Sequence, residues 1–496
     1  MAKINKILIA NRGEIALRVI RSAKEMGIKT VAVFSEADRN ALHVKAADEA
    51  ICLGPPPSSK SYLLGDKIIE KCKELKVDAI HPGYGFLSEN ASFAQKSADA
   101  GIIFIGPSPH SIEVMGNKLA AKKAVGKYDI PQVPGVDRAV TDPNEAKKIA
   151  EQIGFPVLIK ASAGGGGKGM RVVDSEDELE EQMNLAISEA TSSFGDGSVF
   201  VEKFITSPRH IEIQVLGDQH GNIVHLFERE CSVQRRHQKV IEEAPSKVVS
   251  EKMRDEMGKA AIMVAKSCDY YGAGTVEFIV DENLDFFFLE MNTRLQVEHP
   301  VTEAITGVDL VKEQIRIAEG QELPFKQEDL VIKGHAVESR VYAEDPKNNF
   351  LPDIGKLEVY RRPQGPGVRV DDGFEEGMDI PIYYDPMISK LTVFAKDRDE
   401  ALERMIRAID EYEIVGIETT LEFCKFVMGH EAFISGDFDT KFVEKHFKPE
   451  MLEKKASKEE TEIVAALSGS IFHDLGASKS FLKNGSSQNW KNRAHS

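Results

Sequence analysis

A run of glycines is the first feature of the sequence that could do chemistry. Residues 164–169 read Gly-Gly-Gly-Gly-Lys-Gly and lie between two strand-like segments, 156–161 and 170–173. The backbone N–H groups of so bare a run can close around phosphate oxygens, and Lys160 just upstream adds a positive charge. The run is not a P-loop, because Lys168 is followed by glycine and a strand rather than by Ser or Thr and a helix. We predict a hairpin that folds over a nucleotide as a lid; the alternative is a flexible connector.

Two carboxylates and an amide end two later strand-like runs. Glu277 ends the first run, and Glu290 with Asn292 ends the second. Oxygen ligands of this kind suit Mg²⁺, which takes one or two carboxylates and leaves its other positions to phosphate oxygens and water. The pattern therefore predicts a magnesium site. The alternative is an ordinary ion pair between these carboxylates and the neighbouring Arg294.

An arginine, a second amide and a third carboxylate come next, in Arg294-Leu-Gln-Val-Glu-His-Pro. Arg294 offers a planar, two-pronged donor for a small oxyanion such as bicarbonate, and Gln296 and backbone N–H groups can add donors. Glu298 is placed to take a proton, since a glutamate of ordinary pKa is ionised at neutral pH. His299, which precedes a proline, is expected to be structural.

A basic and amide-rich stretch lies upstream of both groups. It reads Arg229-Glu-Cys-Ser-Val-Gln-Arg-Arg-His-Gln-Lys239 in a chain whose formal net charge is -17. We interpret this positive cluster as facing a polyphosphate and bicarbonate.

The elements that position these residues begin with an alternation of short apolar runs and helical patterns. Residues 6–10 and 30–34 read as strands around a helix from Ile15 to Met26 that Gly27 ends, and further strand-like runs follow up to residue 105. This predicts an open, mostly parallel α/β sheet over residues 1–116. The first turn lacks GxGxxG, so a dinucleotide site is weakly supported.

The remaining chain divides into three regions by pattern. Residues 117–330 contain the glycine run, a strand-dominated stretch from 199 to 279 and a helix from about 309 to 319; residues 331–447 are strand-rich, then helical. We take 117–330 as one domain with its lid at about 131–203, and 331–447 as the next. Residues 448–496 form a polar tail with one amphipathic stretch, 462–475, and an end read as disordered.

Composition restricts the partners and the compartment. Apolar residues are 42% of the 496 and charged residues 29%, as in a large soluble protein, and the negative net charge argues against nucleic-acid and membrane-surface binding. The five cysteines are scattered, with no metal spacing, and no apolar run approaches the roughly 20 residues of a membrane span. No secretory signal is visible, so we expect a cytoplasmic protein with reduced thiols.

Five motifs follow one another along the chain: Asn11-Arg-Gly-Glu-Ile-Ala, His81-Pro-Gly-Tyr-Gly-Phe-Leu-Ser-Glu-Asn, Gly165-Gly-Gly-Lys-Gly-Met, Gln234-Arg-Arg-His-Gln-Lys and Glu290-Met-Asn-Thr-Arg-Leu-Gln-Val-Glu-His-Pro. Taken together, they resemble the motifs of the biotin carboxylase family of the ATP-grasp superfamily, and the resemblance covers about residues 3–447. The fold that this implies is α/β with α+β regions: an N-terminal parallel sheet domain, an ATP-grasp domain with a glycine-rich lid, and a C-terminal biotin carboxylase domain.

The resemblance implies a role for each matching residue. Those implied for ATP are Lys118, Lys160, Gly166, Gly167, Gln234, His237, Glu277 and Glu290, with Glu202, Lys203, Phe204 and Ile205 bordering the adenine and His210 nearby. Those implied for the metal are Glu277, Glu290 and Asn292, and those for bicarbonate are Lys239, Arg294, Gln296 and Val297. The implied catalytic residues are Lys239, Arg294, Glu298 and Arg340, of which Arg340 also binds biotin.

The implied reaction uses ATP, Mg²⁺ (or Mn²⁺) and bicarbonate to carboxylate biotin. Glu298 deprotonates bicarbonate, which attacks the γ-phosphate to give carboxyphosphate. This intermediate breaks down to CO₂ and phosphate, and the phosphate takes the proton from the ureido nitrogen of biotin. Arg340 stabilises the resulting enolate oxygen, and electrostatic clamping of phosphate charge supplies most of the catalysis.

The biotin is expected on a separate carrier protein, because the chain has no Met-Lys-Met turn and no region of carboxyltransferase length follows. Expected partners are therefore the biotin carboxyl carrier protein and carboxyltransferase subunits, and the carboxyltransferase chooses an acyl-CoA or pyruvate as acceptor. The family also implies a homodimer, with Arg21 and Glu25 matching its contacts and Pro366 and Arg369 where the family uses Phe and Arg. A second departure is Ala163, at the start of a glycine run that is often longer.

Two other function classes compete with this interpretation. A carbamoyl phosphate synthetase type of ligase shares the carboxyphosphate chemistry and would respond to ammonia rather than to biotin. A regulatory ATP-binding module would not need Lys239, Arg294, Glu298 and Arg340 together.

For the stretch 462–475, apolar residues near one helical face predict a helix that packs on the catalytic body or, alternatively, docks another protein of the complex.

Overall fold

The computed structural model describes residues 3–162, 169–452, 463, 466–468 and 470. The chain divides into two compact units, Met1–Lys448 and Pro449–Ser496. The predicted lid glycines and most of the predicted tail helix lie outside the described residues. Within the tail stretch, residues 463, 466–468 and 470 are helical, as predicted, and Ile463 and Leu467 are exposed.

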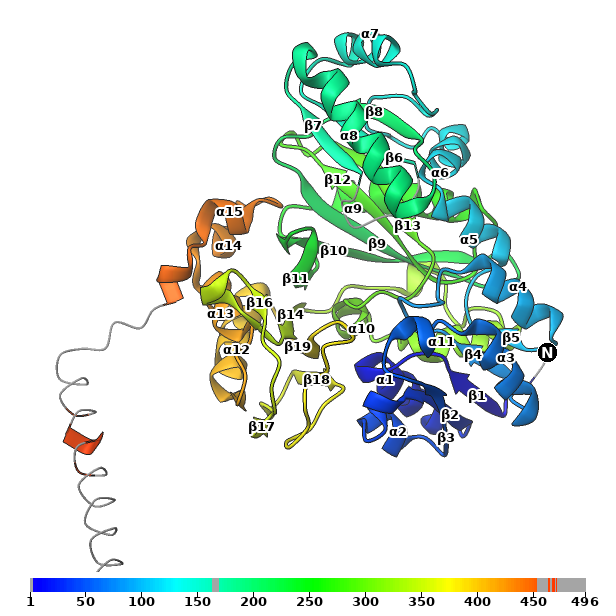
Figure 1. Ribbon diagram of the computed structural model, residues 1–496, viewed down its shortest axis with the longest axis vertical. Coiled ribbons are helices and arrows are strands. Elements are labelled where there is room, and N and C mark those ends of the chain that lie inside the picture. The colour runs from blue at the N-terminus through cyan, green and yellow to red at the C-terminus, as the bar shows by residue number, and fades with distance from the viewer. Residues whose placement is uncertain (1–2, 163–168, 453–462, 464–465, 469, 471–496) are drawn as a thin grey trace, which may run out of the picture. The chain divides into compact units, whose positions relative to one another are not determined.

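The first unit begins with a five-stranded sheet in which every pair of neighbours is parallel, as predicted. Its strand order is β3 (Glu49–Gly54), β2 (Lys29–Ser35), β1 (Lys6–Ile9), β4 (Ala79–His81) and β5 (Ile103–Phe104), coloured blue in Figure 1. The intervening helices are α1 (Gly13–Glu25), α2 (Leu42–Ala46), α3 (Gly65–Glu74), α4 (Ala91–Asp99) and α5 (Pro109–Gly116).

Helix α1 shows how the sequence builds this layer. Ile15, Val19 and Ala23 recur every four residues and are buried on one face of the helix. The helix ends where predicted, because Gly27 adopts the left-handed φ of 74° that a helix terminus often requires.

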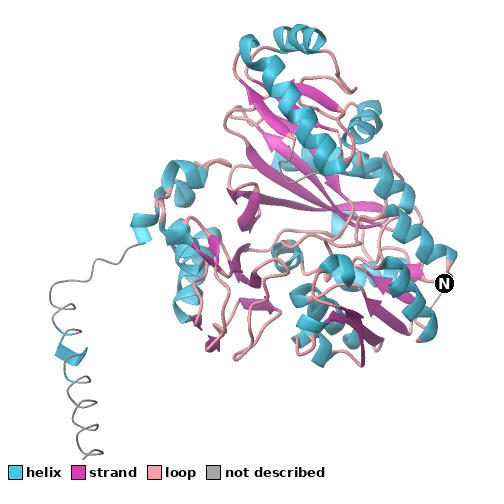
Figure 2. Ribbon diagram, in the orientation of Figure 1, coloured by secondary structure: helices cyan, strands magenta, loops and turns pink. Residues whose placement is uncertain are grey.

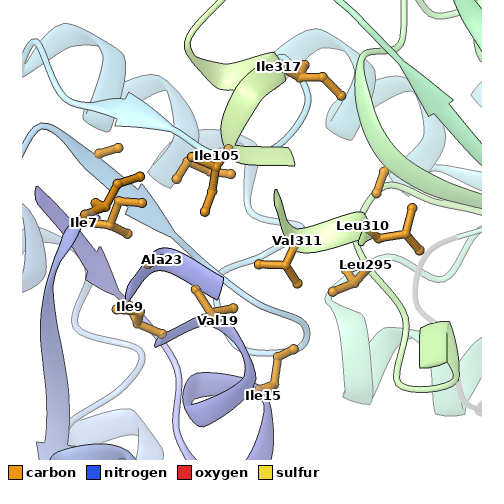
Figure 3. Close-up of a cluster of buried hydrophobic side chains, with 14 of the residues drawn as sticks. Ile7, Ile9, Ile15, Val19, Ala23, Ile105, Leu295, Leu310, Val311 and Ile317 are labelled. Atoms are coloured by element: carbon orange, nitrogen blue, oxygen red, sulfur yellow. The ribbon is translucent and has the colours of Figure 1, made fainter. Parts of the chain in front are cut away.

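The core under this helix joins two regions that are distant in sequence. Ile15 and Val19 of α1 pack in one cluster with Leu310 and Val311 of α11 (Leu310–Ala318), as Figure 3 shows. Leu295, from the segment that carries the predicted bicarbonate residues, belongs to the same cluster. The N-terminal layer therefore supports the floor of the candidate site.

A three-stranded antiparallel sheet carries the segment around the glycine run. Its order is β7 (Met170–Val173), β6 (Val157–Ala161) and β8 (Val199–Lys203). Helix α8 (Glu176–Phe194) crosses one face of it, next to α7 (Pro143–Ile153) (Figure 2). Helix α6 (Lys118–Val125) precedes this layer.

The largest sheet has eight antiparallel strands. Their order is β13 (Phe286–Asn292), β12 (Gly272–Val280), β9 (Arg209–Gly217), β10 (Ile223–Arg235), β11 (Gln238–Ala244), β14 (His335–Tyr342), β19 (Met387–Ala395) and β18 (Val368–Asp372). Because β11 pairs with β14, one sheet runs without a break from the strands of Glu277 and Glu290 to the strand of Arg340.

Helices cover this sheet. They are α9 (Glu251–Lys266), α10 (His299–Thr306) and α12 (Arg398–Glu411), followed by α13 (Leu421–Gly429), α14 (Glu431–Ser435) and α15 (Phe442–His446). The predicted helices at 309–319 and 398–411 are confirmed. In the described part of the chain, no helix is both long enough and apolar enough to span a membrane.

One helix was missed in the stretch predicted to be dominated by strands. Helix α9 begins after Ser250, whose side chain accepts a hydrogen bond from the backbone of Met253, and it buries Met257, Ala261 and Val264 on one face. The spacing of these residues is helical, but strongly β-forming segments on both sides masked it.

Candidate active site

One cavity of about 700 Å³ lies between the three-stranded and eight-stranded sheets, and it brings the predicted site residues together. Every one that the structure describes lines it: Lys118, Lys160, Glu202, Lys203, Phe204, Ile205, His210, Gln234, His237, Lys239, Glu277, Glu290, Asn292, Arg294, Gln296, Val297, Glu298 and Arg340. The remaining two, Gly166 and Gly167, lie outside the described residues.

At one end, lysines gather around a buried carboxylate. Lys160 on β6 and Lys122 on α6 both form an ion pair with Glu202 on β8. The distance from Lys122 Nζ to Glu202 Oε2 is 2.8 Å. Burial raises the pKa of Glu202, but the two ammonium charges outweigh it, so the net pKa is lowered. Burial also lowers the pKa of Lys118. Lysines crowded this closely suit the phosphates of a nucleotide.

The same end has an apolar wall. Lys203 turns its ammonium to the backbone carbonyls of Gly154 and Phe155, at 3.0 and 2.9 Å, so the ammonium is engaged within the chain and is not available to a base. Apolar side chains complete the wall: Val133, Leu158, Met170, Phe204, Ile205 and Leu289. An aromatic base would fit here, because ligand pockets are lined mainly by such side chains.

The predicted metal carboxylates face each other across two strands. The register of β12 and β13 sets Glu277 opposite Glu290. Burial and then the charge of Glu277 raise the pKa of Glu290. Like charges directly opposite are destabilising, so a divalent cation between them fits this pair, and oxygen donors are what Mg²⁺ takes. Asn292, whose Nδ2 lies 2.9 Å from Glu277 Oε1, completes the donor set.

Arg294 is held by a residue that the sequence did not assign. Its Nε donates to Glu89 Oε2 at 2.9 Å and its Nη2 to Asn292 Oδ1 at 2.9 Å. The interpretation of Arg294 as an ordinary partner of Glu277 and Glu290 is therefore wrong, because its ion pair is with Glu89. Glu89 stands in the motif that begins at His81, which was the available signal.

Glu298 lies between two cations from neighbouring strands and is 1% exposed. Lys239 on β11 donates to its Oε1 at 2.6 Å, and Arg340 on β14 donates to its Oε2 at 2.8 Å. Burial raises the pKa of Glu298, but the charges of Lys239, Arg340 and Arg229 outweigh it and hold the pKa well below its ordinary value. The carboxylate is therefore ionised at neutral pH and oriented by both cations.

Two residues of the sequence motifs face the core. Arg229 was expected to face polyphosphate, but it is fully buried and donates to Glu212, Gln214 and Gln296 among others, because a guanidinium can bridge several strands. Its contact with the Gln296 Oε1, at 2.9 Å, makes it a support of the site. His299 is also buried and bonds to the carbonyl of Gln296, as expected of a structural residue.

Several lining residues carried no signal in the sequence. Phe350, Thr440, Lys441 and Glu444 reach the cavity from elements far from the motifs. Two other lining residues stand beside or within predicted segments: Arg209 precedes His210 on β9, and Arg235, from the basic stretch, is held by Glu344 at 2.5 Å.

Comparison with known proteins identifies three consecutive family models in the chain. "Biotin carboxylase, N-terminal domain" matches residues 3–112, "Carbamoyl-phosphate synthase L chain, ATP binding domain" matches 117–326, and "Biotin carboxylase C-terminal domain" matches 338–445. The middle model is named for the competing ligase class, whereas the flanking two are named for biotin carboxylase.

Biotin carboxylase 1 of Bacillus subtilis is 52% identical over 442 residues, which cover 89% of this chain and 98% of that relative. The chain belongs to the biotin carboxylase family. Human mitochondrial propionyl-CoA carboxylase alpha chain is 53% identical, but the chain spans only 65% of that relative's length. The biotin carboxylase domain dimer of Hydrogenobacter thermophilus 2-oxoglutarate carboxylase, solved with MgADP, ADP and bicarbonate, superposes with a TM-score of 0.87 at 47% identity, covering 92% of this chain and 100% of that one. The biotin carboxylase fold predicted from the motifs is confirmed.

Two of the four residues matched to the family's dimer contacts, Glu25 and Arg369, have ion-pair partners within the chain. Glu25 pairs with Lys312 at 2.5 Å and is otherwise exposed, as is Arg21. Arg369 lies in strand β18 rather than in a loop, and it pairs with Glu303 at 2.8 Å and Asp371 at 2.7 Å. Pro366 is exposed.

Proposed function

We propose that this chain is the biotin carboxylase component of a multi-subunit carboxylase. It consumes ATP and bicarbonate and carboxylates biotin on a separate carrier protein, giving ADP and phosphate. The observation that carries the proposal is the position of Glu298, between Lys239 and Arg340 in a cavity that also holds the facing carboxylates Glu277 and Glu290. One end of the cavity suits a nucleotide. The other end supplies a base, Glu298, and a cation for biotin, Arg340.

The first half of the reaction is the activation of bicarbonate. Arg294, Gln296 and the backbone of Val297 bind the anion with Lys239, and Glu298 accepts its proton. An oxygen of the resulting carbonate attacks the γ-phosphorus of ATP, the bond to ADP breaks, and carboxyphosphate forms. Glu277, Glu290 and Asn292 would hold Mg²⁺, or Mn²⁺, which would neutralise phosphate charge.

The second half transfers CO₂ to biotin. Carboxyphosphate splits into CO₂ and phosphate, and the phosphate removes the proton from the biotin ureido nitrogen. Arg340 stabilises the negative charge on the ureido oxygen, and the nitrogen attacks CO₂. Arg340 suits this role because it is 7% exposed, lines the cavity, and is oriented by Glu242 at 2.6 Å and Glu298 at 2.8 Å.

The partners follow from this chemistry. We propose a biotin carboxyl carrier protein as the substrate and a carboxyltransferase that consumes its carboxybiotin. Relatives named for pyruvate and for propionyl-CoA share this chain's sequence family, so the acyl acceptor is a property of the carboxyltransferase. A homodimer is supported by the dimeric 2-oxoglutarate carboxylase domain. The five cysteines of this chain are free thiols, as is ordinary for a cytoplasmic protein.

The test measures phosphate release from ATP by the purified full chain with Mg²⁺. We expect release that requires bicarbonate and is stimulated by free biotin. Stimulation by ammonia instead of biotin would indicate a carbamoyl phosphate synthetase type of ligase. Nucleotide binding without any turnover under these conditions would indicate a regulatory module, and either result would overturn the proposal.

A further inference from the structure

Behind the bicarbonate segment lies a buried lysine to which no role has been assigned. Lys390, on β19, is fully buried, and its Nζ donates to the backbone carbonyl of Val297 at 2.8 Å. The ammonium also forms an ion pair with Glu14 of helix α1 at 3.3 Å. Burying an ammonium costs several kcal/mol unless polar groups surround it, so the contacts of Lys390 need an explanation.

The pairing register places Lys390 directly beside Arg340. The two residues are cross-strand partners on β19 and β14, and partners in an antiparallel pair project from the same face of the sheet. Both side chains reach the same two-residue segment, Arg340 the carboxylate of Glu298 at 2.8 Å and Lys390 the carbonyl of Val297. Two cations from adjacent strands therefore hold the Val297–Glu298 segment. Lys390 binds the carbonyl of Val297, and Arg340 binds the side chain of Glu298.

This segment needs such a support because it belongs to no strand. It connects β13 to α10, and Glu298 is the residue that precedes the first turn of that helix. A carbonyl in a trans peptide lies opposite the N–H of the next residue, so fixing the Val297 oxygen also fixes the direction of the Glu298 N–H. A peptide left without that bond could rotate and carry the base at Glu298 out of position.

We propose that Lys390 is a positioning residue for bicarbonate activation, acting through the Val297–Glu298 peptide. This inference rests on the proposed function. The competing explanation is structural: Lys390 would only neutralise Glu14 and so attach β19 to helix α1. The two explanations differ in which contact of Lys390 is required for activity: the carbonyl of Val297 in the first, the carboxylate of Glu14 in the second.

The test compares four full-length variants, of which Lys390→Arg is the conservative one, with the wild-type chain in biotin-stimulated ATP cleavage. Lys390→Met removes both contacts, Glu14→Gln removes only the ion pair, and the double variant Glu14→Gln/Lys390→Met removes both members of that pair, so that neither charge is left without the other. Melting temperatures and KM values for ATP and bicarbonate are measured for each.

We expect kcat/KM for bicarbonate to fall on the order of 10–100-fold in the two variants that carry Lys390→Met, while KM for ATP stays within about twofold, because a displaced base affects only its own step. Glu14→Gln should lower the melting temperature and leave the bicarbonate parameters unchanged. Lys390→Arg, which keeps a charged donor, should recover part of the rate. A double variant that turns over bicarbonate like Glu14→Gln alone would overturn the inference. A wild-type chain without bicarbonate-dependent cleavage would instead overturn the proposed function.

Discussion

Replacing Glu298 with glutamine removes the proposed base while nearly conserving its shape. The carboxylate is 1% exposed and accepts charge-assisted hydrogen bonds from Lys239 at 2.6 Å and Arg340 at 2.8 Å. Neither cation is left alone in the variant, because Lys239 keeps Glu277 at 2.9 Å and Arg340 keeps Glu242 at 2.6 Å.

Two magnitudes follow for Glu298→Gln. Breaking a buried pair costs ~3–5 kcal/mol when a charge is stranded. Here the remaining carboxylates prevent that, so we expect a stability loss of about 1–3 kcal/mol, the cost of charge-assisted hydrogen bonds alone. Loss of a general base lowers a rate roughly 10²–10⁴-fold, which is ~3–5 kcal/mol in the activation free energy. The rate should therefore collapse in a protein that still folds and binds ATP.

The assay is biotin-stimulated phosphate release at saturating ATP, bicarbonate and Mg²⁺, with nucleotide affinity and melting temperature measured in parallel. Glu303→Gln is the matched control. Glu303 is buried and lies on helix α10, which begins directly after Glu298. It accepts hydrogen bonds from Arg18 and Arg369, each at 2.8 Å. In the control variant Arg18 still has its ion pair with Asp309, and Arg369 still has its ion pair with Asp371. The control should lose stability but not rate. A fall of less than about threefold for Glu298→Gln would refute the base assignment, given the range expected for a general base.

Three further predictions address the rest of the chain. Arg340→Ala should abolish carboxybiotin formation and preserve ATP affinity. The site should survive the change, since Glu242, the partner that Arg340 leaves, has a pKa of about 7, raised by burial, and can be protonated. Loss of ATP affinity with a normal yield of carboxybiotin per bound ATP would assign Arg340 to the nucleotide. Glu290→Gln should raise the Mg²⁺ concentration for half-maximal ATP cleavage on the order of tenfold or more, and an unchanged Mg²⁺ titration would exclude Glu290 as a ligand. Truncation after Lys448 should lower the melting temperature and leave assembly with the carrier or carboxyltransferase intact, because the tail helix is expected to pack on the catalytic body; weakened assembly with unchanged cleavage of ATP in the presence of free biotin would instead indicate docking by the tail.

Local pattern was enough for much of the secondary structure. Helix α12 spans Arg398–Glu411 as predicted, and α1 ends before Gly27, because helical periodicity and a left-handed glycine are properties of short segments. The parallel order of the first sheet also followed from alternating strands and helices. Helix α9 shows the limit, since its apolar spacing is helical but its burial against β9 and β10 decides the outcome.

The candidate site shows the same division. The sequence by itself determined which residue types are available, and their motifs identified the family, because phosphate, metal and oxyanion chemistry restrict the residues that can serve them. Tertiary structure alone decided how these residues are supported. Glu89 holds Arg294 from 205 positions away, Arg229 turns into the core, and Lys390 stands beside Arg340. These facts depend on strand register and on which face is buried, and both are set by partner strands that no local pattern contains.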